Sequence, residues 1–214
     1  MMNVKKRQAE EPLVSLQFSE KKHRVGEEFE SMKMVARGKA NHGVADGVGG
    51  WARKGIGAGD YARELMKNVT VAIKEEAKDS VDPKRVLNHA FMNTKAKGSS
   101  IASIVYLKKN VLHGVNTLLE YQVLVEPGDV LVLGTDGVFD NKYPFEIESI
   151  LKDMTEEGRL MDVQECAKVI ASMAWRLSIS KIGGPFADAC KKVGVNHKGG
   201  KMDDITVLVA HIIV

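Results

Sequence analysis

The stretch His42-Gly43-Val44-Ala45-Asp46-Gly47-Val48-Gly49-Gly50-Trp51 decides how this chain is organised. A short apolar run leads directly into a carboxylate and then into a turn rich in glycine. This is how a β-strand presents an acidic side chain and accessible backbone at its end. The pattern therefore predicts a strand that delivers Asp46 to the edge of a sheet.

Two later stretches repeat this arrangement. One is the apolar run 130–134, which leads into Thr135-Asp136-Gly137, and the other is Met202-Asp203-Asp204, which opens a last apolar strand. Carboxylates at the ends of three strands can converge on one point, and carboxylate and carbonyl oxygens are ligands that magnesium and manganese prefer. The alternative is that each Asp-Gly is only a tight turn, which is the commoner role of a lone Asp-Gly.

Taken together, the three stretches resemble the metal-dependent protein serine/threonine phosphatases of type 2C. The resemblance lies in the order G-V-A-D-G-V-G-G-W, G-D-V-L-V-L-G-T-D-G-V-F-D-N and G-G-K-M-D-D-I-T-V-L, and runs from about Gly43 to the C-terminus. The first motif, G-V-A-D-G-V-G-G-W, resembles that of a small branch of the family with mitochondrial and plastid members.

The resemblance implies an α+β fold, a four-layer α-β-β-α sandwich of two antiparallel sheets flanked by helices, formed by a single domain over residues 1–214. It also implies a site for two magnesium or manganese ions. On the family pattern Asp46 bridges both metals, the Gly47 carbonyl binds one, and Asp136 and Asp203 complete the other. Asp204 is the less favoured ligand, although a shift of one residue would exchange it with Asp203.

The function implied is hydrolysis of phosphoserine and phosphothreonine in phosphoproteins through a metal-bridging hydroxide, with Asp46, Asp136 and Asp203 as the catalytic residues. Two metal ions can supply the nucleophile and neutralise the phosphoryl oxygens, so no cysteine or serine nucleophile is needed. The sequence agrees, because neither Cys166 nor Cys190 is followed by the arginine of a C-x5-R loop, and a G-x-S-x-G elbow is absent.

Members of that family hold the substrate phosphate with an arginine near the N-terminus, and the resemblance implies Arg24 as the matching residue. The alternative is that Arg24, Glu27 and Glu28 form a solvated charged turn. His23 and His42 are the nearest general acids in sequence, but the simpler interpretation of each is a surface or turn histidine.

The middle of the chain departs from the family. Residues 99–107 and 111–118 predict a hairpin, after which family members continue with a strand ending in Gly-Asp-Ser and further strands. This chain is shortened there, between about 108 and 120, so that part of the central sheet region is missing. Since missing strands would leave unpaired sheet edges, either the remaining strands pair anew or the reading frame lacks an exon.

The other elements follow from periodicity and end signals. Tyr61, Leu65, Val69 and Ile73 predict a helix, and Asp82-Pro83 predicts the start of another with Val86, Leu87, Ala90 and Phe91 inward. The remaining expectations are strands at 14–19 and 32–37, a hairpin of 121–126 with 130–134, helices at 144–154 and 185–193, a helix capped by Asp162 that buries Cys166, Val169, Ile170, Met173 and Leu177, and a final strand within 203–214.

The composition of the chain limits the kinds of partner that we expect it to bind. The 214 residues carry 31 Lys and Arg against 28 Asp and Glu, an excess too small to argue for nucleic acid, and no apolar stretch is long enough for a membrane span. We therefore expect a phosphoprotein substrate, no nucleic acid and no membrane span, with the oligomeric state open. The branch resemblance favours a mitochondrial location, whereas the polar N-terminus, if complete, favours the cytoplasm.

A rival from another class is a catalytically inactive phosphatase-like module that binds or regulates a partner. The missing Gly-Asp strand and the loosely matched arginine favour it. The three aspartates oppose it, because buried carboxylates without a cation are costly. A calcium-binding structural domain is a weaker rival, because the sequence lacks an EF-hand loop.

Overall fold

The computed structural model describes residues 34–35, 41–77, 80–116, 119–156 and 162–212. The described residues form two compact units, one from residues 34–129 with Ile212 and one from residues 130–211. Each unit contains one antiparallel sheet with helices packed against it. The α+β class with two antiparallel sheets flanked by helices is therefore confirmed.

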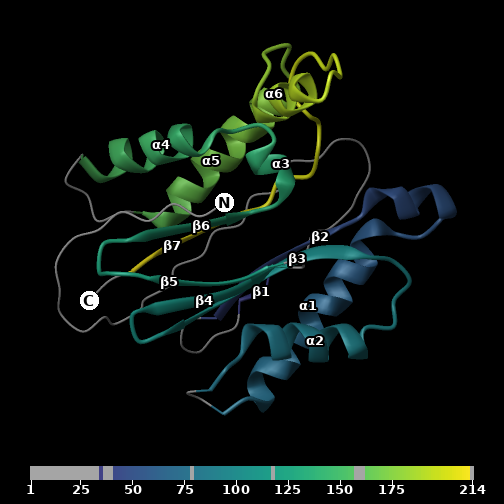
Figure 1. Cartoon of the computed structure of the whole chain (residues 1–214), viewed down its shortest axis with the longest axis vertical. Helices are drawn as coiled ribbons and strands as arrows, with labels where there is room; N and C mark the ends of the chain where they lie inside the picture. The colour runs from purple at the N-terminus through teal and green to yellow at the C-terminus, as the bar shows by residue number, and fades with distance from the viewer. Residues whose placement is uncertain (1–33, 36–40, 78–79, 117–118, 157–161, 213–214) are drawn as a thin grey trace. The chain divides into compact units, whose positions relative to one another are not determined.

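The first unit is built on a five-stranded sheet in which each strand pairs with the next along the chain (Figure 1). Its strands are β1 (Met34–Val35), β2 (Asn41–Gly47), β3 (Ser100–Lys108), β4 (Val111–Asn116) and β5 (Glu120–Leu124). Asp46 pairs with Ile101, and Gly47 with Ser100, at the end of the β2–β3 ladder. The predicted strand ending at Asp46 is thus present.

Two helices pack on this sheet, α1 (Ala58–Glu75) and α2 (Pro83–Asn93), after the short 3₁₀ helix η1 (Gly49–Lys54). Side chains four residues apart on α1 are buried against the sheet, as the sequence predicted, because this spacing places them on one helix face. The shared core comprises Ala45, Tyr61, Ala62, Leu65, Met66, Val69, Ala72, Val86, Ala90, Ala102, Ile104 and Val115.

Helix α2 begins as predicted, because the Asp82 carboxylate accepts hydrogen bonds from the backbone N–H groups of Lys84 and Arg85. The expected inward face is partly wrong. Phe91 is 58% exposed, whereas Val86 and Ala90 are buried. Val86 and Ala90 lie on the face of α2 that packs against α1. Phe91, the next residue after Ala90, lies on another face of the helix, so its ring points to solvent.

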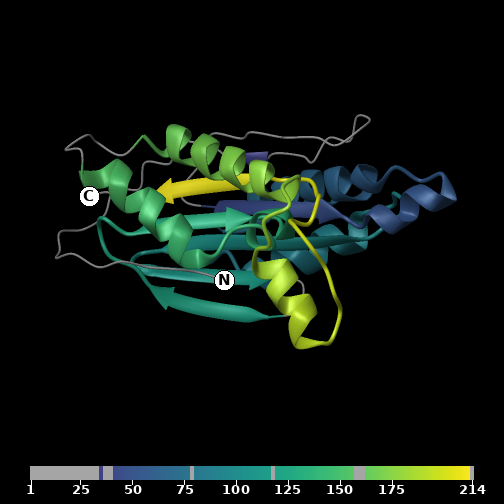
Figure 2. The ribbon, with the colours of Figure 1, turned by 90° about the horizontal axis from the view of Figure 1, so that it is seen from above.

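The second unit pairs β6 (Val130–Gly134) with β7 (Val207–His211) and places four helices after β6. These are α3 (Asp136–Phe139), α4 (Pro144–Glu156), α5 (Val163–Ser178) and α6 (Pro185–Lys192). In both ribbon views α5 runs beside β7 (Figure 1; Figure 2). Their shared core is Val138, Ile147, Val163, Cys166, Ala167, Ile170, Ala171, Ala174, Ile205, Val207 and Val209.

Helix α5 is capped by Asp162, as predicted, with hydrogen bonds from the backbone N–H groups of Gln164 and Glu165. Its buried stripe is rotated from the predicted one, since Met173 is 36% exposed while Ala171 and Ala174 are fully buried. The alanines let the helix approach β7 closely, and the larger Met173 faces away from that contact.

The expected hairpin between residues 121–126 and 130–134 is wrong. A turn does form there, because the Asp129 N–H donates to the Glu126 carbonyl, but the flanking strands pair elsewhere. Strand β5 pairs with β4, and β6 pairs with β7. The strands on either side of residues 117–119 therefore pair with each other, and this pairing is compatible with both explanations of the shortened middle.

The expected strand at 14–19 and the residues His23, Arg24, Glu27 and Glu28 lie outside the described part of the chain. So does most of the strand expected at 32–37, of which the described part is β1. None of the helices in the described ranges combines the length and apolar character needed to cross a membrane.

Candidate metal centre

Three carboxylates meet within the second unit. Asp136 is the first residue of α3, Asp140 follows the end of that helix, and Asp203 lies shortly before β7. Each offers an oxygen, and these three oxygens all lie within 4.8 Å of one another. Two strand-end aspartates that the sequence singled out, Asp136 and Asp203, are thus brought together.

Thr135 fixes the two aspartate-bearing segments side by side. Its backbone N–H donates to the Thr206 carbonyl (3.1 Å), and its hydroxyl accepts from the Thr206 N–H (3.1 Å). The same hydroxyl donates to the Asp204 carbonyl (3.0 Å). These bonds continue the pairing of β6 and β7 beyond Gly134, so Asp136 and Asp203 leave the two strands at the same end.

Gly137 makes the close approach sterically possible. A Cβ atom at this position would lie 2.4 Å from the Asp204 carbonyl oxygen and 3.2 Å from the Cβ atom of Asp203. No other residue fits there without displacing backbone. The Asp-Gly pair at 136–137 is therefore more than a turn signal, because its glycine lets the segment of Asp203 and Asp204 pack on α3.

The Lys201 ammonium lies among the three carboxylates. Its Nζ atom is 2.9 Å from Asp136 Oδ2, 2.7 Å from Asp140 Oδ2 and 2.9 Å from Asp203 Oδ2. Burial would lower the pKa of Lys201, but hydrogen bonds to Asp140, Asp136 and Asp203 outweigh it and raise the pKa above its ordinary value. Lys201 is therefore a charged member of the cluster.

Asn141 holds the backbone of Lys201 from both sides. Its Oδ1 accepts from the Lys201 N–H (2.9 Å), and its Nδ2 donates to the Lys201 carbonyl (2.8 Å) and to the Gly137 carbonyl (2.9 Å). Only 1% of the Asn141 surface is exposed. Because buried amide hydrogen bonds are costly to break, this side chain ties the Lys201 segment to α3.

Phe186 forms another side of the cluster. Its backbone N–H donates to the Asp140 carbonyl (3.0 Å), and its ring centroid is 5.3 Å from the Lys201 ammonium. The His197 ring packs edge-on against Phe186 at 4.9 Å. The start of α6 is therefore attached to the acidic cluster through both backbone and ring contacts.

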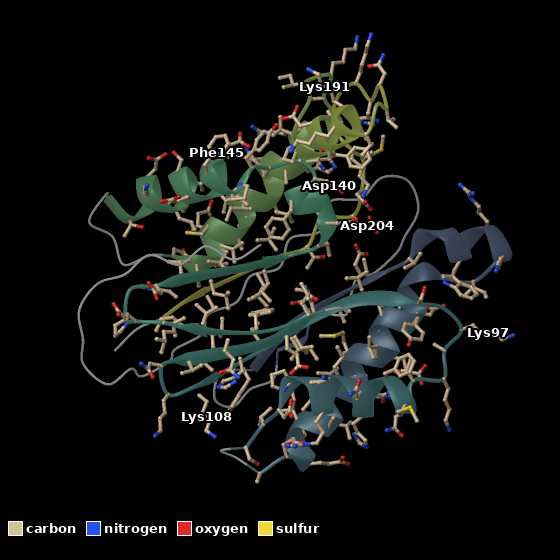
Figure 3. All side chains as sticks on the ribbon, in the orientation of Figure 1. Lys97, Lys108, Asp140, Phe145, Lys191 and Asp204 are labelled. Atoms are coloured by element: carbon tan, nitrogen blue, oxygen red, sulfur yellow. The ribbon has the colours of Figure 1, made fainter. Side chains whose placement is uncertain are left out.

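Of the two adjacent aspartates, Asp203 is the one that joins the cluster. Its Oδ1 accepts from the Asp204 N–H (2.9 Å), which orients Oδ2 toward Lys201. Asp204 contributes its backbone to this geometry, through that N–H and the carbonyl that accepts from Thr135. Asp140 and Asp204 both lie beside α3 (Figure 3).

The donor set fits a divalent cation. Three carboxylates and one ammonium leave the cluster with a formal charge of −2. Carboxylate oxygens within reach of one another are the ligands that magnesium and manganese take. Asp136, Asp140 and Asp203 would hold the ion, and the ammonium among them shows that the cluster already accommodates a positive charge.

The other predicted ligands, Asp46 and Gly47, stand together in the first unit. Both are partly buried at the end of β2, where the Ser100 hydroxyl donates to the Asp46 carbonyl (2.7 Å). The next residues are held too, because the Val48 N–H donates to the Ser99 carbonyl (3.0 Å) and the Trp51 indole donates to the Ser99 hydroxyl (2.8 Å). This strand end is firmly hydrogen-bonded.

Asp140, Lys201 and Asn141 were not among the site residues predicted from the sequence. Asp140 and Asn141 follow the second motif directly, so their place in it is a usable signal. Lys201 carries a weaker one, its position two residues before Asp203. The side chain of His42 and all of His23 and Arg24 lie outside what the structure describes.

Known protein phosphatases match this chain over most of its length. The chain is 38% identical to the probable protein phosphatase 2C 55 of Arabidopsis thaliana, over 79% of this chain and 45% of that protein. It is 30% identical to the protein phosphatase PTC7 homolog fig of Drosophila mojavensis, over 89% of this chain and 79% of that protein. The chain belongs to the protein phosphatase 2C family. No family model matches it.

Solved structures of type 2C phosphatases share its fold. The photosystem II phosphatase PBCP superimposes with a TM-score of 0.73 at 23% identity, over 91% of this chain and 98% of that one. The catalytic domain of the serine/threonine phosphatase PstP, solved in complex with two manganese ions, gives 0.60 at 15% identity, over 93% and 99%. The chain spans about half the length of two Arabidopsis thaliana relatives, the probable protein phosphatases 2C 55 and 2C 80.

Proposed function

We propose that this chain is a metal-dependent protein serine/threonine phosphatase that uses two magnesium or manganese ions. The observation that carries the proposal is the meeting of Asp136, Asp140 and Asp203 around a positive charge, in a member of the protein phosphatase 2C family. The two manganese ions bound in the PstP complex support the choice of metal.

We assign metal binding to Asp136 and Asp203 in one unit and to Asp46 and the Gly47 carbonyl in the other, following the family's motifs. Bound ions of this kind activate water and neutralise phosphoryl oxygens. The protein's own part is to hold the backbone segments that carry these residues, through Thr135 and Gly137 in the second unit and through Ser100 in the first. Arg24 remains the proposed phosphate contact.

The substrate class that follows is a phosphoprotein carrying phosphoserine or phosphothreonine. We also propose that the middle of the chain is shortened relative to the family. Support comes from the alignment with phosphatase 2C 55, which spans 212 positions but only 79% of the 214 residues here, so the relative has residues within the aligned region that this chain lacks. The location in an organelle, suggested by the branch, is likewise a prediction.

The test is hydrolysis of a phosphothreonine peptide by the purified chain, with manganese or with EDTA. We expect turnover that depends on manganese and is lost in Asp46→Asn and Asp203→Asn. Asp153→Asn is the matched control, because Asp153 is exposed on α4. A folded protein that binds manganese without turnover would instead indicate the inactive binding module.

A further inference from the structure

The Lys201 side chain occupies the place where a cation would bind. Its Nζ atom contacts the Oδ2 atoms of Asp136, Asp140 and Asp203 at 2.7–2.9 Å. At Asp203 the other oxygen, Oδ1, is engaged by the backbone N–H of Asp204. A metal ion that takes Asp203 Oδ2 therefore meets the ammonium there.

The position of Lys201 is built into the fold. Asn141 clamps its backbone N–H and carbonyl, and the ring of Phe186 lies beside its ammonium. The side chain of Lys201 is 27% exposed, so solvent cannot fully screen its charge from the carboxylates. Since Asn141 binds only the backbone of Lys201, a change of side chain leaves the clamp intact.

We propose that Lys201 is an internal counter-ion that assembles the acidic cluster in the metal-free protein and competes with the divalent cation for it. The proposal rests on the metal binding proposed above. Without metal, the ammonium offsets the mutual repulsion of three carboxylates. When metal binds, the same positive charge opposes it, so Lys201 sets how much metal is needed.

Lys201→Met separates these effects, because it removes the charge and keeps an unbranched side chain. We expect the dissociation constant for manganese, measured by calorimetry with the metal alone, to fall on the order of tenfold, as follows when a like charge a few ångströms away is removed. The thermal midpoint in EDTA should also fall, by about 2–4 °C, because the carboxylates lose their counter-ion.

Two variants serve as controls. Lys198→Met removes an exposed charge three residues away and should change neither quantity. Lys201→Arg keeps the positive charge and should retain both the weak manganese binding and most of the metal-free stability. This variant also keeps the proposal testable if Lys201→Met does not fold without metal.

The outcomes distinguish the two proposals. If wild type binds manganese and Lys201→Met binds it no more tightly, the competition is wrong while the metal site stands. If neither protein binds manganese, the metal site and the competition are both wrong. An unchanged midpoint for Lys201→Met in EDTA would overturn the role of Lys201 in the metal-free protein.

Discussion

The absence of a side chain at position 137 is what lets Asp203 approach Asp136. The backbone of Asp204 passes so close to α3 that a methyl group at Gly137 would overlap its carbonyl oxygen. Thr135 and Asn141 then hold the same two segments with hydrogen bonds. The geometry of the carboxylates therefore depends on neighbours that carry no charge.

Gly137→Ala should lower both stability and manganese affinity. Alanine favours the helical conformation by up to ~1 kcal/mol relative to glycine, but an atom 2.4 Å from backbone costs about 1–3 kcal/mol in displaced structure. The clash should prevail, giving a lower urea midpoint than wild type. Gly50→Ala, where a Cβ meets nothing within 4 Å, is the control, and a stabilised Gly137→Ala would contradict the steric argument.

At this scale the sequence indicated two of the residues that lie close together, both of a type that carries metal-binding chemistry by itself. Asp136 and Asp203 were singled out because they follow and precede apolar strands, and the structure brings them together. Lys201 and Asn141 were not, because a lysine or asparagine in a loop acquires its role only through tertiary contacts. The contacts of Lys201 with Asn141 and Asp136 join positions 60 and 65 apart in the chain.

Among the elements, helices were easier to predict than strand partners. The N-cap residues Asp82 and Asp162 mark helix starts in the sequence, and each makes the expected backbone bonds. Strand pairing lacks such a local signal. The Pro127-Gly128-Asp129 turn predicted a hairpin, whereas β6 pairs with β7, because the apolar run of β7 covers the whole length of β6.

The pairing of β6 and β7 should also be sensitive to acid. Burial lowers the pKa of His211 on β7 below its ordinary value. The unfolded chain then binds the proton more tightly, so the stability from neutral His211 is present above about pH 6.5 and declines as the pH falls below that value.

We expect His211→Gln to lose less thermal stability than wild type between pH 7.5 and pH 5.5. Equal losses in wild type and His211→Gln would show that the imidazole titrates in the same way in folded and unfolded chains.

At the scale of the whole molecule, each unit has its own core and its own tryptophan. Trp51 belongs to the unit with the five-stranded sheet, and Trp175 packs against the core of the other. The sequence predicted a single domain with a shortened middle, which stays a prediction. The pairing of β5 with β4 could not be predicted from the sequence. The residues of β5 fit equally well a hairpin with β6 across the turn that follows.

Manganese should stabilise both units if Asp46 binds the same ions as Asp136 and Asp203. Trp51→Phe leaves a fluorescent reporter in one unit, and Trp175→Phe leaves one in the other. In both variants we expect manganese to raise the unfolding midpoint, as a ligand of the native state does. Adding Asp46→Asn should reduce both gains, whereas a gain seen only by Trp175 would remove Asp46 from the metal site.

The pairing of β6 with β7 also has a consequence for the nascent chain during translation. Asp136 and Asp140 leave the ribosome before Lys201, which contacts Asp136 from 65 positions further along. At roughly 5–20 residues per second, that separation corresponds to about 3–13 s of translation. During this interval α3 to α6 emerge while β6 still lacks β7, so the acidic cluster is among the last features of its unit to be completed.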